Sequence, residues 1–312
     1  MHRQRAASAL GREKETCQNC GTPLRGEFCH ACGQSVHNPI RHASHALEEV
    51  VESIWHLDGR VFRTLRDLLL PGRVANRYLA GHRVRYVAPL RLFLVLSVLT
   101  FVVAELAMQV AANNSSPEER AVLVREDPGD LEQADAGLLK WSGVAWLPGF
   151  ANHWLREQNL RIRENLPRVR KDPDLLMHAY LSAVPKALFV LVPLFALLLK
   201  LAYARRGRLY MEHLVVALYS HAWLCLAVMV ISLLSILGTV AKPHVAWVAW
   251  GTDSINTLLL WMIPLYLLLM QKLVYREGWR RTLLKFAAFG GLYLVIVSTS
   301  AVLLVLLSLA RI

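Results

Sequence analysis

Long runs of apolar residues alternate with polar and basic segments over the later two-thirds of the chain. Five of these runs reach the roughly 20 residues that a helix needs to cross a bilayer. They lie near 90–111, 183–204, 214–240, 255–274 and 286–310, and the pattern leaves open whether the fourth begins near 246 or 255. The pattern predicts an all-α polytopic membrane protein with about five transmembrane helices, formed by a membrane domain over 89–312.

Two other regions have helical periodicity without a span. In 38–88 apolar residues recur every three or four positions, which predicts amphipathic helices, with Asp58 as the N-cap of the second. Residues 113–180, between the first two spans, contain Pro and acidic residues placed as at helix starts. We expect a helical loop there.

Composition agrees with a membrane protein. Of the 312 residues 55% are hydrophobic and 19% charged, yet the formal net charge is +12. This charge must lie in the segments that connect the spans, where it reports orientation and lipid contact. Residues 1–16 lack the apolar core of a signal sequence and are expected to form a disordered polar tail.

Two CxxC pairs occupy residues 17–34, and a glycine follows each pair. Four thiolates at this spacing favour a small zinc ribbon in which Zn²⁺ has a structural role. The sulfur ligands are Cys17, Cys20, Cys29 and Cys32. The alternatives are two disulfides in an exported head, a redox dithiol, a catalytic zinc, or His30 as a substitute ligand.

Arginines dominate the segment just before the first span, where Asp67 is the one acid between Arg60 and Arg91. This bias acts at least as a topological signal, and it also suits an interfacial platform on anionic lipid. The lipid-binding candidates are Arg60, Arg63, Arg66, Arg73 and Arg77. A nucleic-acid surface is not favoured, because few aromatic residues are interleaved with the arginines.

A reduced zinc head and a basic segment place the N-terminus in the cytoplasm. Segments 204–213 and 275–285 are rich in arginine and fall on the same side, whereas 241–254 holds little positive charge and falls outside. Five spans then leave the C-terminus on the outer side.

Few polar residues lie within the predicted spans. His221 and Cys225 are one turn apart, and Glu105 lies near the outer end of the first span. A charged or titratable residue in a membrane invites a functional interpretation as a metal ligand or a proton relay, but a neutral histidine bonded to a neighbouring helix is the ordinary alternative.

The segments CQNCGTPLRGEFCHACGQ and VFRTLRDLLLPGRVANRYLAGHRVRYVAPLRLFLVLS together resemble a bacterial family of membrane proteins of unknown function with an N-terminal zinc ribbon. Residues 17 to about 97 carry the resemblance. It implies a zinc head, an amphipathic neck and a multispan body in the bacterial inner (cytoplasmic) membrane, with the outer loop in the periplasm. It implies no active site.

The sequence therefore predicts a non-enzymatic anchor or scaffold whose ribbon and basic neck bind a protein partner and anionic lipid. A small-solute permease or transporter subunit is the alternative, and a membrane-embedded enzyme is the third. The sequence identifies neither the partner nor the oligomeric state.

Overall fold

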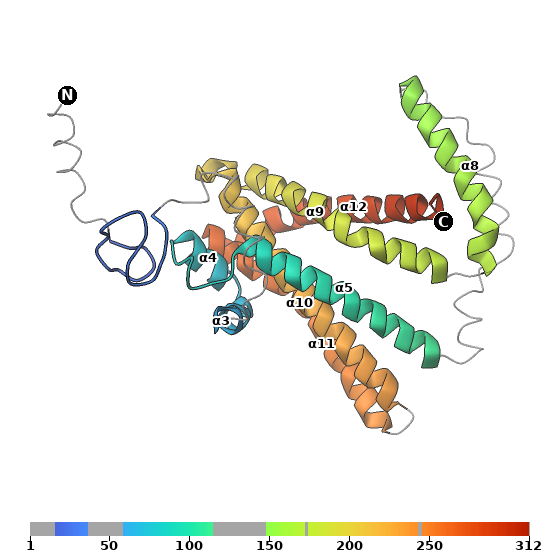
Figure 1. Ribbon diagram of the computed structural model, residues 1–312, viewed down its shortest axis with the longest axis horizontal. Helices are drawn as coiled ribbons and strands as arrows, with labels where there is room; N and C mark the ends of the chain where they lie inside the picture. Colours follow the sequence, from blue (N-terminus) through green and yellow to red (C-terminus); the bar gives the residue numbers. More distant parts are fainter. Residues whose placement is uncertain (1–15, 37–58, 115–147, 172–173, 243–244, 312) are drawn as a thin grey trace. The chain divides into compact units, whose positions relative to one another are not determined.

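The computed structural model describes residues 16–36, 59–114, 148–171, 174–242 and 245–311. Within these ranges the prediction of an all-α protein is confirmed, since the β pairing comprises two isolated bridges near the cysteines. The α-helices, labelled in Figure 1, are α3 (Gly59–Leu68), α4 (Arg73–Leu79), α5 (Pro89–Asn114), α8 (Gly149–Lys171), α9 (Asp174–Ala202), α10 (Tyr210–Ala241), α11 (Ala246–Tyr275) and α12 (Trp279–Leu309). The 3₁₀ turn η2 (Ala204–Arg206) lies between α9 and α10.

Five helices are long and apolar enough to cross a membrane, as predicted. These candidate spans are Pro89–Asn114, Ala183–Ala202, Tyr210–Ala241, Trp247–Tyr275 and Trp279–Leu309. Only 11% to 35% of each apolar window is buried, so most of its side chains face outward, as lipid contact requires. The protein is therefore an integral membrane protein by length and composition.

One helix boundary that the sequence left open is now defined, and another differs from the expected one. Helix α11 begins at Ala246, the earlier of the two expected starts, because the segment with Trp247 and Trp250 continues the helix. Helix α12 begins at Trp279, so Arg280 and Arg281 lie on its first turn and not in a loop. Arginine is a good helix former, and its long side chain reaches the interface from a helix end.

Contacts divide the chain into two compact units. Unit 1 comprises Met1–Ser97, Val192–Ala227 and Leu260–Phe289, and unit 2 comprises Val98–Leu191, Val228–Leu259 and Gly290–Ile312. Helices α5, α9, α10, α11 and α12 each contribute residues to both units. The functional candidates described below lie mostly in unit 1.

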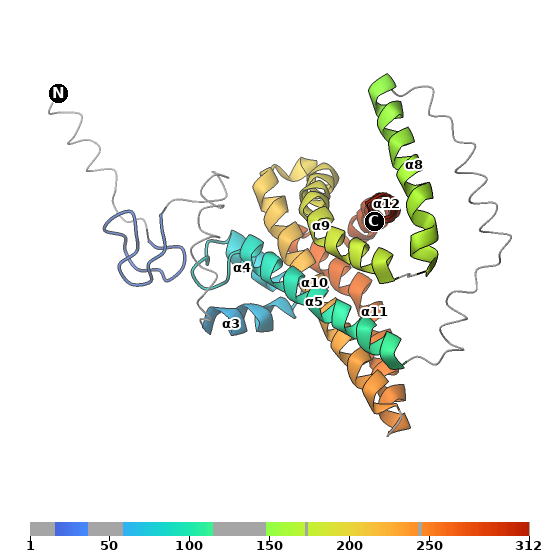
Figure 2. The ribbon, with the colours of Figure 1, turned by 45° about the vertical axis from the view of Figure 1, so that its right-hand side comes forward.

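In unit 1 the neck, which we define as residues 59–88, packs against the spanning helices. The Tyr266 hydroxyl donates to the Leu68 carbonyl at 2.5 Å, and the Tyr219 hydroxyl donates to the Val87 carbonyl at 2.9 Å. Leu68 and Val74 are buried. Figure 2 shows α3 and α4 near the end of α5 at which that helix begins. The neck is thus part of a folded body. The buried residues of α3 are Thr64, Asp67 and Leu68, whereas Phe62 of its apolar stripe stays exposed.

In unit 2 the described part of the 113–180 loop contains α8, a helix as predicted. Its Ile162 clusters with Leu309 and Ala310, and Asn165 donates through Nδ2 to the Leu309 carbonyl at 2.9 Å. The predicted helix starts at 116–119 and 172–173 lie outside the described residues. So do residues 1–15 and residues 38–58, which include the first amphipathic helix predicted in 38–88 and the predicted N-cap Asp58.

Candidate metal centre and neck

The four cysteines lie on two loops of the same construction. In the first loop the Cys17 amide donates to the Thr22 carbonyl and the Gly21 amide donates back to the Cys17 carbonyl, both at 2.8 Å. The second loop repeats these contacts through Cys29, Gln34 and Gly33. Gly21 and Gly33 have φ of 77° and 73°, a conformation that glycine adopts without steric cost. The CxxCG spacing therefore builds two matching knuckles.

The sulfurs converge. All four are free thiols whose Sγ atoms lie within 4.8 Å of one another, with Cys17 to Cys32 at 3.6 Å and Cys20 to Cys29 at 3.5 Å. A tetrahedral metal with sulfur at ~2.3 Å places neighbouring sulfurs about 3.8 Å apart. The residues present thus fit one four-coordinate metal ion. Among the described residues this is the one group of three or more His, Cys, Asp and Glu side chains close enough to share an ion.

The Cys20 sulfur lies at the exposed side of this cluster. A hydrogen bond of 3.2 Å joins it to the Thr22 hydroxyl. This contact, together with hydrogen bonds to the Thr22 backbone and to Cys29 and Cys32, lowers the pKa of the thiol to about 6. Because thiolates are the ligands of soft metals, the geometry favours the metal-binding form of Cys20 at neutral pH.

The ribbon, which we define as residues 16–36, is joined to the neck by Gln34. Its side chain is buried, donates through Nε2 to the Gly81 carbonyl at 2.8 Å, and accepts from the amides of Arg83 and Val84 at 3.2 and 3.4 Å. The adjacent Gly81 (φ 105°) leaves no room for a Cβ beside Gln18. The residue that follows the second CxxCG thus links the cysteine loops to the membrane body.

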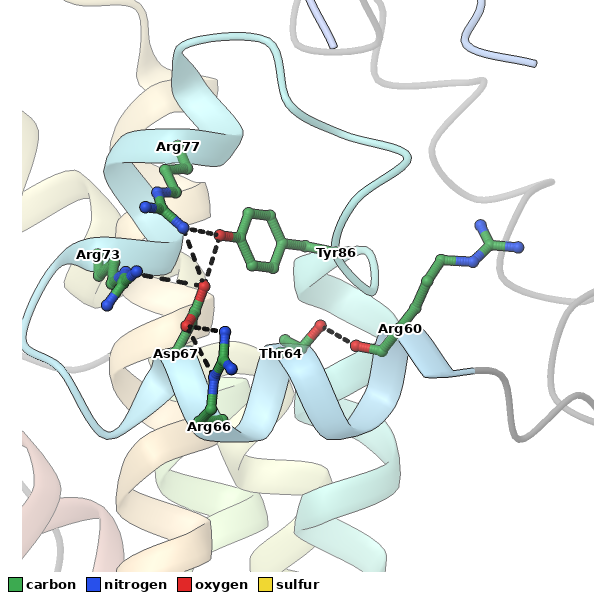
Figure 3. Close-up of polar contacts among 7 residues, drawn as sticks. All are labelled: Arg60, Thr64, Arg66, Asp67, Arg73, Arg77 and Tyr86. Atoms are coloured by element: carbon green, nitrogen blue, oxygen red, sulfur yellow. Dashed lines mark hydrogen bonds and ion pairs between the residues drawn. The ribbon is translucent and has the colours of Figure 1, made fainter. Parts of the chain in front are cut away.

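Asp67, at the end of α3, is the centre of a charged cluster in the neck (Figure 3). Its carboxylate accepts a hydrogen bond from the Tyr86 hydroxyl at 2.7 Å and lies 3.1 Å from the nearest Arg77 nitrogen. Arg66 and Arg73 approach it to 3.3 and 3.7 Å. Only 1% of the Asp67 side chain is exposed, whereas 37% to 69% of these arginine side chains is. We call this set the Asp67 cluster.

The electrostatics of the Asp67 cluster follow from its geometry. Burial alone would raise the pKa of Asp67, but the Tyr86 hydrogen bond and the charges of Arg73 and Arg66 outweigh it and lower that pKa. Asp67 therefore stays ionised and holds together the turn between α3 and α4.

The opposite side of α3 is exposed and combines apolar with basic residues. Phe62 on α3 is 74% exposed, and Leu69, the first residue after this helix, is 61% exposed. Arg63 and Arg66 of α3 are exposed as well. Such a face is typical of helices that lie in a membrane interface.

The neck is also where the chain matches a known family. Residues 58–101 match the family model described as Protein of unknown function (DUF3667). The match begins just before α3 and ends within α5, so it covers the Asp67 cluster and leaves out the cysteines. No curated protein and no solved structure gives a significant match to the chain.

The predicted lipid-binding arginines have two different environments. Arg66, Arg73 and Arg77 contact Asp67, whereas the side chains of Arg60 and Arg63 lie at the exposed part of α3. Lipid contact by these residues stays a prediction. Sequence reasoning missed the Asp67 cluster, although a single acid among eight arginines was the available signal.

The predicted intramembrane polar residues lie in different units. His221 and Cys225 are buried on α10 in unit 1, and Glu105 lies on α5 in unit 2. His221 Nδ1 is 2.8 Å from the Ala217 carbonyl, and its ring packs edge-on against Phe195. The structure thus places His221 in an aromatic pocket, and its ligand or relay role stays a prediction.

A second polar cluster, which the sequence did not reveal, lies at the end of α9, the start of α10 and the end of α11. The rings of Tyr203 and Tyr275 stack at 3.6 Å, and His213 Nδ1 lies 2.8 Å from the Tyr275 hydroxyl. Lys285 and Arg208 cover the outer ring faces at 4.4 and 5.2 Å. Burial raises the pKa of Tyr203. These contacts fix the two basic loops to each other.

Proposed function

We propose that this protein is a non-enzymatic membrane adaptor. Its metal ribbon presents a docking site to a protein partner, and the neck holds that site against anionic lipid. Zn²⁺ is the proposed metal, because four thiolates in a tetrahedral arrangement suit it, and such a set leaves no open coordination position for a substrate. Nucleic acid is not a proposed ligand, since the exposed face of α3 offers one aromatic ring, Phe62.

The exposure of Phe28 is the observation that carries the proposal. It is the only Phe, Tyr or Trp residue of the ribbon, and a ribbon with almost no core would be expected to use it as a cover for the metal. The structure instead leaves 64% of it exposed, so it provides little cover. A rigid ribbon that is tied to the membrane body by Gln34 and displays an aromatic side chain has the properties of a docking module.

The lipid contact is supported by the exposed face of α3. Phe62, Leu69 and Leu70 can enter the headgroup boundary while Arg63 and Arg66 meet anionic lipid. Protein partner and lipid thus use different surfaces of unit 1.

The proposed location is a bacterial inner membrane with the N-terminus in the cytoplasm and the C-terminus in the periplasm. In unit 1 the neck contacts the end of α11 through Asn76 and the Leu273 carbonyl, and the loop after α11 contacts Arg206 through Glu277. The neck and both basic loops therefore share one side, which the positive-inside rule assigns to the cytoplasm. A phosphatase reporter fused at the C-terminus should be active and a cytoplasmic reporter there silent. The reverse pattern would refute this orientation.

Partner binding is tested by crosslinking in cells with a photoreactive residue in the ribbon. We expect one discrete protein adduct, and we expect Phe28→Ser to reduce it at least about tenfold, the effect of losing about 1.4 kcal/mol of binding. Phe150→Ser removes an equally large ring that is 80% exposed on α8, and it should leave the adduct intact.

Metal content must be unchanged in both variants for the comparison to hold. An adduct that survives Phe28→Ser at full yield would remove the ribbon surface from the proposal. Movement of a solute by the purified protein in liposomes, without any adduct, would favour the permease interpretation.

A further inference from the structure

A basic pocket lies in unit 1 between the start of α4 and the end of α11. Its volume is about 490 Å³, and it is lined by Pro71, Arg73, Asn76, Lys272, Leu273 and Arg276. Three of these six residues are cations and none is an acid. Lys272, Leu273 and Arg276 lie outside the segment that the family model matches, and neither cation is among the lipid-binding arginines that the sequence predicted.

Within the described residues, few acidic side chains pair with the cations of this pocket. Arg73 shares Asp67 with two other arginines, at 3.7 Å. Lys272 donates to the Glu277 carbonyl and lies 5.1 Å from the centre of the Trp279 ring. In the part of the chain that the structure describes, the Glu277 carboxylate pairs with Arg206 and Lys285 instead. The pocket therefore attracts an anion.

The neck and the end of α11 are in close contact at the pocket. A Cβ on Gly72 (φ 70°) would lie 3.2 Å from Val274 Cγ2 and 3.5 Å from the Met270 carbonyl oxygen, so the backbone of the neck approaches α11 closely. Asn76 Nδ2 donates to the Leu273 carbonyl at 3.3 Å. These contacts hold the two walls of the pocket together.

Arg276 is placed by an uncommon backbone conformation. Its φ is 52°, which makes it the one described residue other than glycine with positive φ. Glycine or asparagine is the ordinary choice at this position after a helix. An arginine in a strained conformation on the rim of an anion-attracting pocket points to a role in binding.

The surroundings of the pocket identify the class of anion. It opens at the end of the spanning helix α11, where a bilayer has its headgroups, and Leu70 and Leu273 beside it are 46% and 48% exposed. A soluble phosphate makes no favourable contact with exposed leucines, whereas the acyl chains of a lipid can pack against them. Basic pockets at the ends of transmembrane helices bind phospholipid headgroups.

We propose that this pocket binds the phosphate of an anionic phospholipid, with Arg73, Lys272 and Arg276 as its ligands and the acyl chains along Leu70 and Leu273. The proposal rests on the lipid contact proposed above and gives it a defined site. The site selects a lipid with net negative charge, because the three cations repel the ammonium group of a zwitterionic headgroup.

The test uses the full chain in detergent, with phosphatidylglycerol, phosphatidylcholine and free glycerol 3-phosphate as probes and native mass spectrometry as the readout. We expect a saturable phosphatidylglycerol adduct, which the Lys272→Gln/Arg276→Asn variant binds at least about tenfold more weakly. Asparagine is chosen because it tolerates positive φ and so retains the fold. Arg280→Gln/Arg281→Gln removes the same amount of charge from exposed positions four and five residues after Arg276. This variant should bind phosphatidylglycerol as wild type does.

Three other outcomes would contradict the proposed lipid site. Equal binding by the pocket variant and wild type would exclude it. Equal occupancy by glycerol 3-phosphate would assign the site to a soluble phosphate. Loss of lipid in Arg60→Gln/Arg63→Gln, with full binding by the pocket variant, would assign the lipid to the face of α3 and leave the adaptor proposal standing. The Phe28 crosslink, which does not depend on lipid, separates failure of the pocket from failure of the adaptor.

Discussion

Removal of the metal is expected to unfold the ribbon and release it from the neck. The residues buried within the ribbon are Cys17, Cys29 and Gln34, so there is almost no apolar core to hold it together. Metal binding contributes about 10–16 kcal/mol in comparable peptides, and we expect it to be the main source of stability of this ribbon. The purified protein should hold one ion for each chain, and a strong chelator, or Cys17→Ser/Cys29→Ser, should abolish that binding.

Hydrogen exchange measures this release at named amides. The N–H groups of Arg83 and Val84 bond to the Gln34 side chain, so they should lose protection when the metal is removed. The Val87 N–H bonds to the Thr64 hydroxyl within the neck at 3.0 Å and should keep its protection. Gln34→Ala should expose Arg83 and Val84 in the same way while retaining the metal. Unchanged exchange at both amides after complete chelation would show that metal does not control the junction.

Replacing Asp67 by asparagine is expected to destabilise unit 1 by about 3 kcal/mol. Loss of one partner from a buried charged cluster typically costs 3–5 kcal/mol. The lower end applies because the arginines are partly exposed and regain water. Thermal unfolding in detergent measures the change, and Glu157→Gln, at an acid that is 51% exposed on α8, is the matched control. Equal stability of the two variants would show that the Asp67 cluster contributes nothing.

The pH dependence isolates the same carboxylate. Because the folded pKa of Asp67 is lowered, its contribution is fully present above its ordinary value near pH 4 and is lost as the pH falls through the folded value. The stability difference between wild type and Asp67→Asn should therefore be constant above about pH 5 and shrink below pH 4. A difference that stays constant down to pH 2 would contradict this assignment.

The sequence predicted those features that depend on local pattern. The spacing of the four cysteines and their glycines led directly to the two knuckles, and apolar runs longer than 20 residues led to five spans. Boundaries were less accurate, because hydropathy does not distinguish an arginine in a loop from one on the first turn of a helix, as at Arg280 and Arg281.

The clusters could not be predicted because their members come from distant segments. Tyr203, His213 and Tyr275 meet only after three spans have packed together. The basic pocket combines neck residues with Lys272 and Arg276, which are about 200 positions later in the chain. Gln34 is visible as part of a motif, but its partners are the backbone groups of residues 81, 83 and 84. Backbone groups leave no pattern in the sequence, so this contact could not be predicted.

The two tyrosines that bond to the neck have a wider consequence. Tyr219 and Tyr266 belong to candidate spanning helices, and their hydroxyls donate to the carbonyls of Val87 and Leu68 in the neck. Gln34 of the ribbon bonds to the same neck at Gly81. The neck therefore contacts both the spanning helices and the cysteine loops. Energetic coupling between two sites is reciprocal. If metal occupancy changes how the neck packs on α10 and α11, then a change in the thickness or tension of the surrounding bilayer that shifts this packing also changes the affinity of the cysteines for their ion.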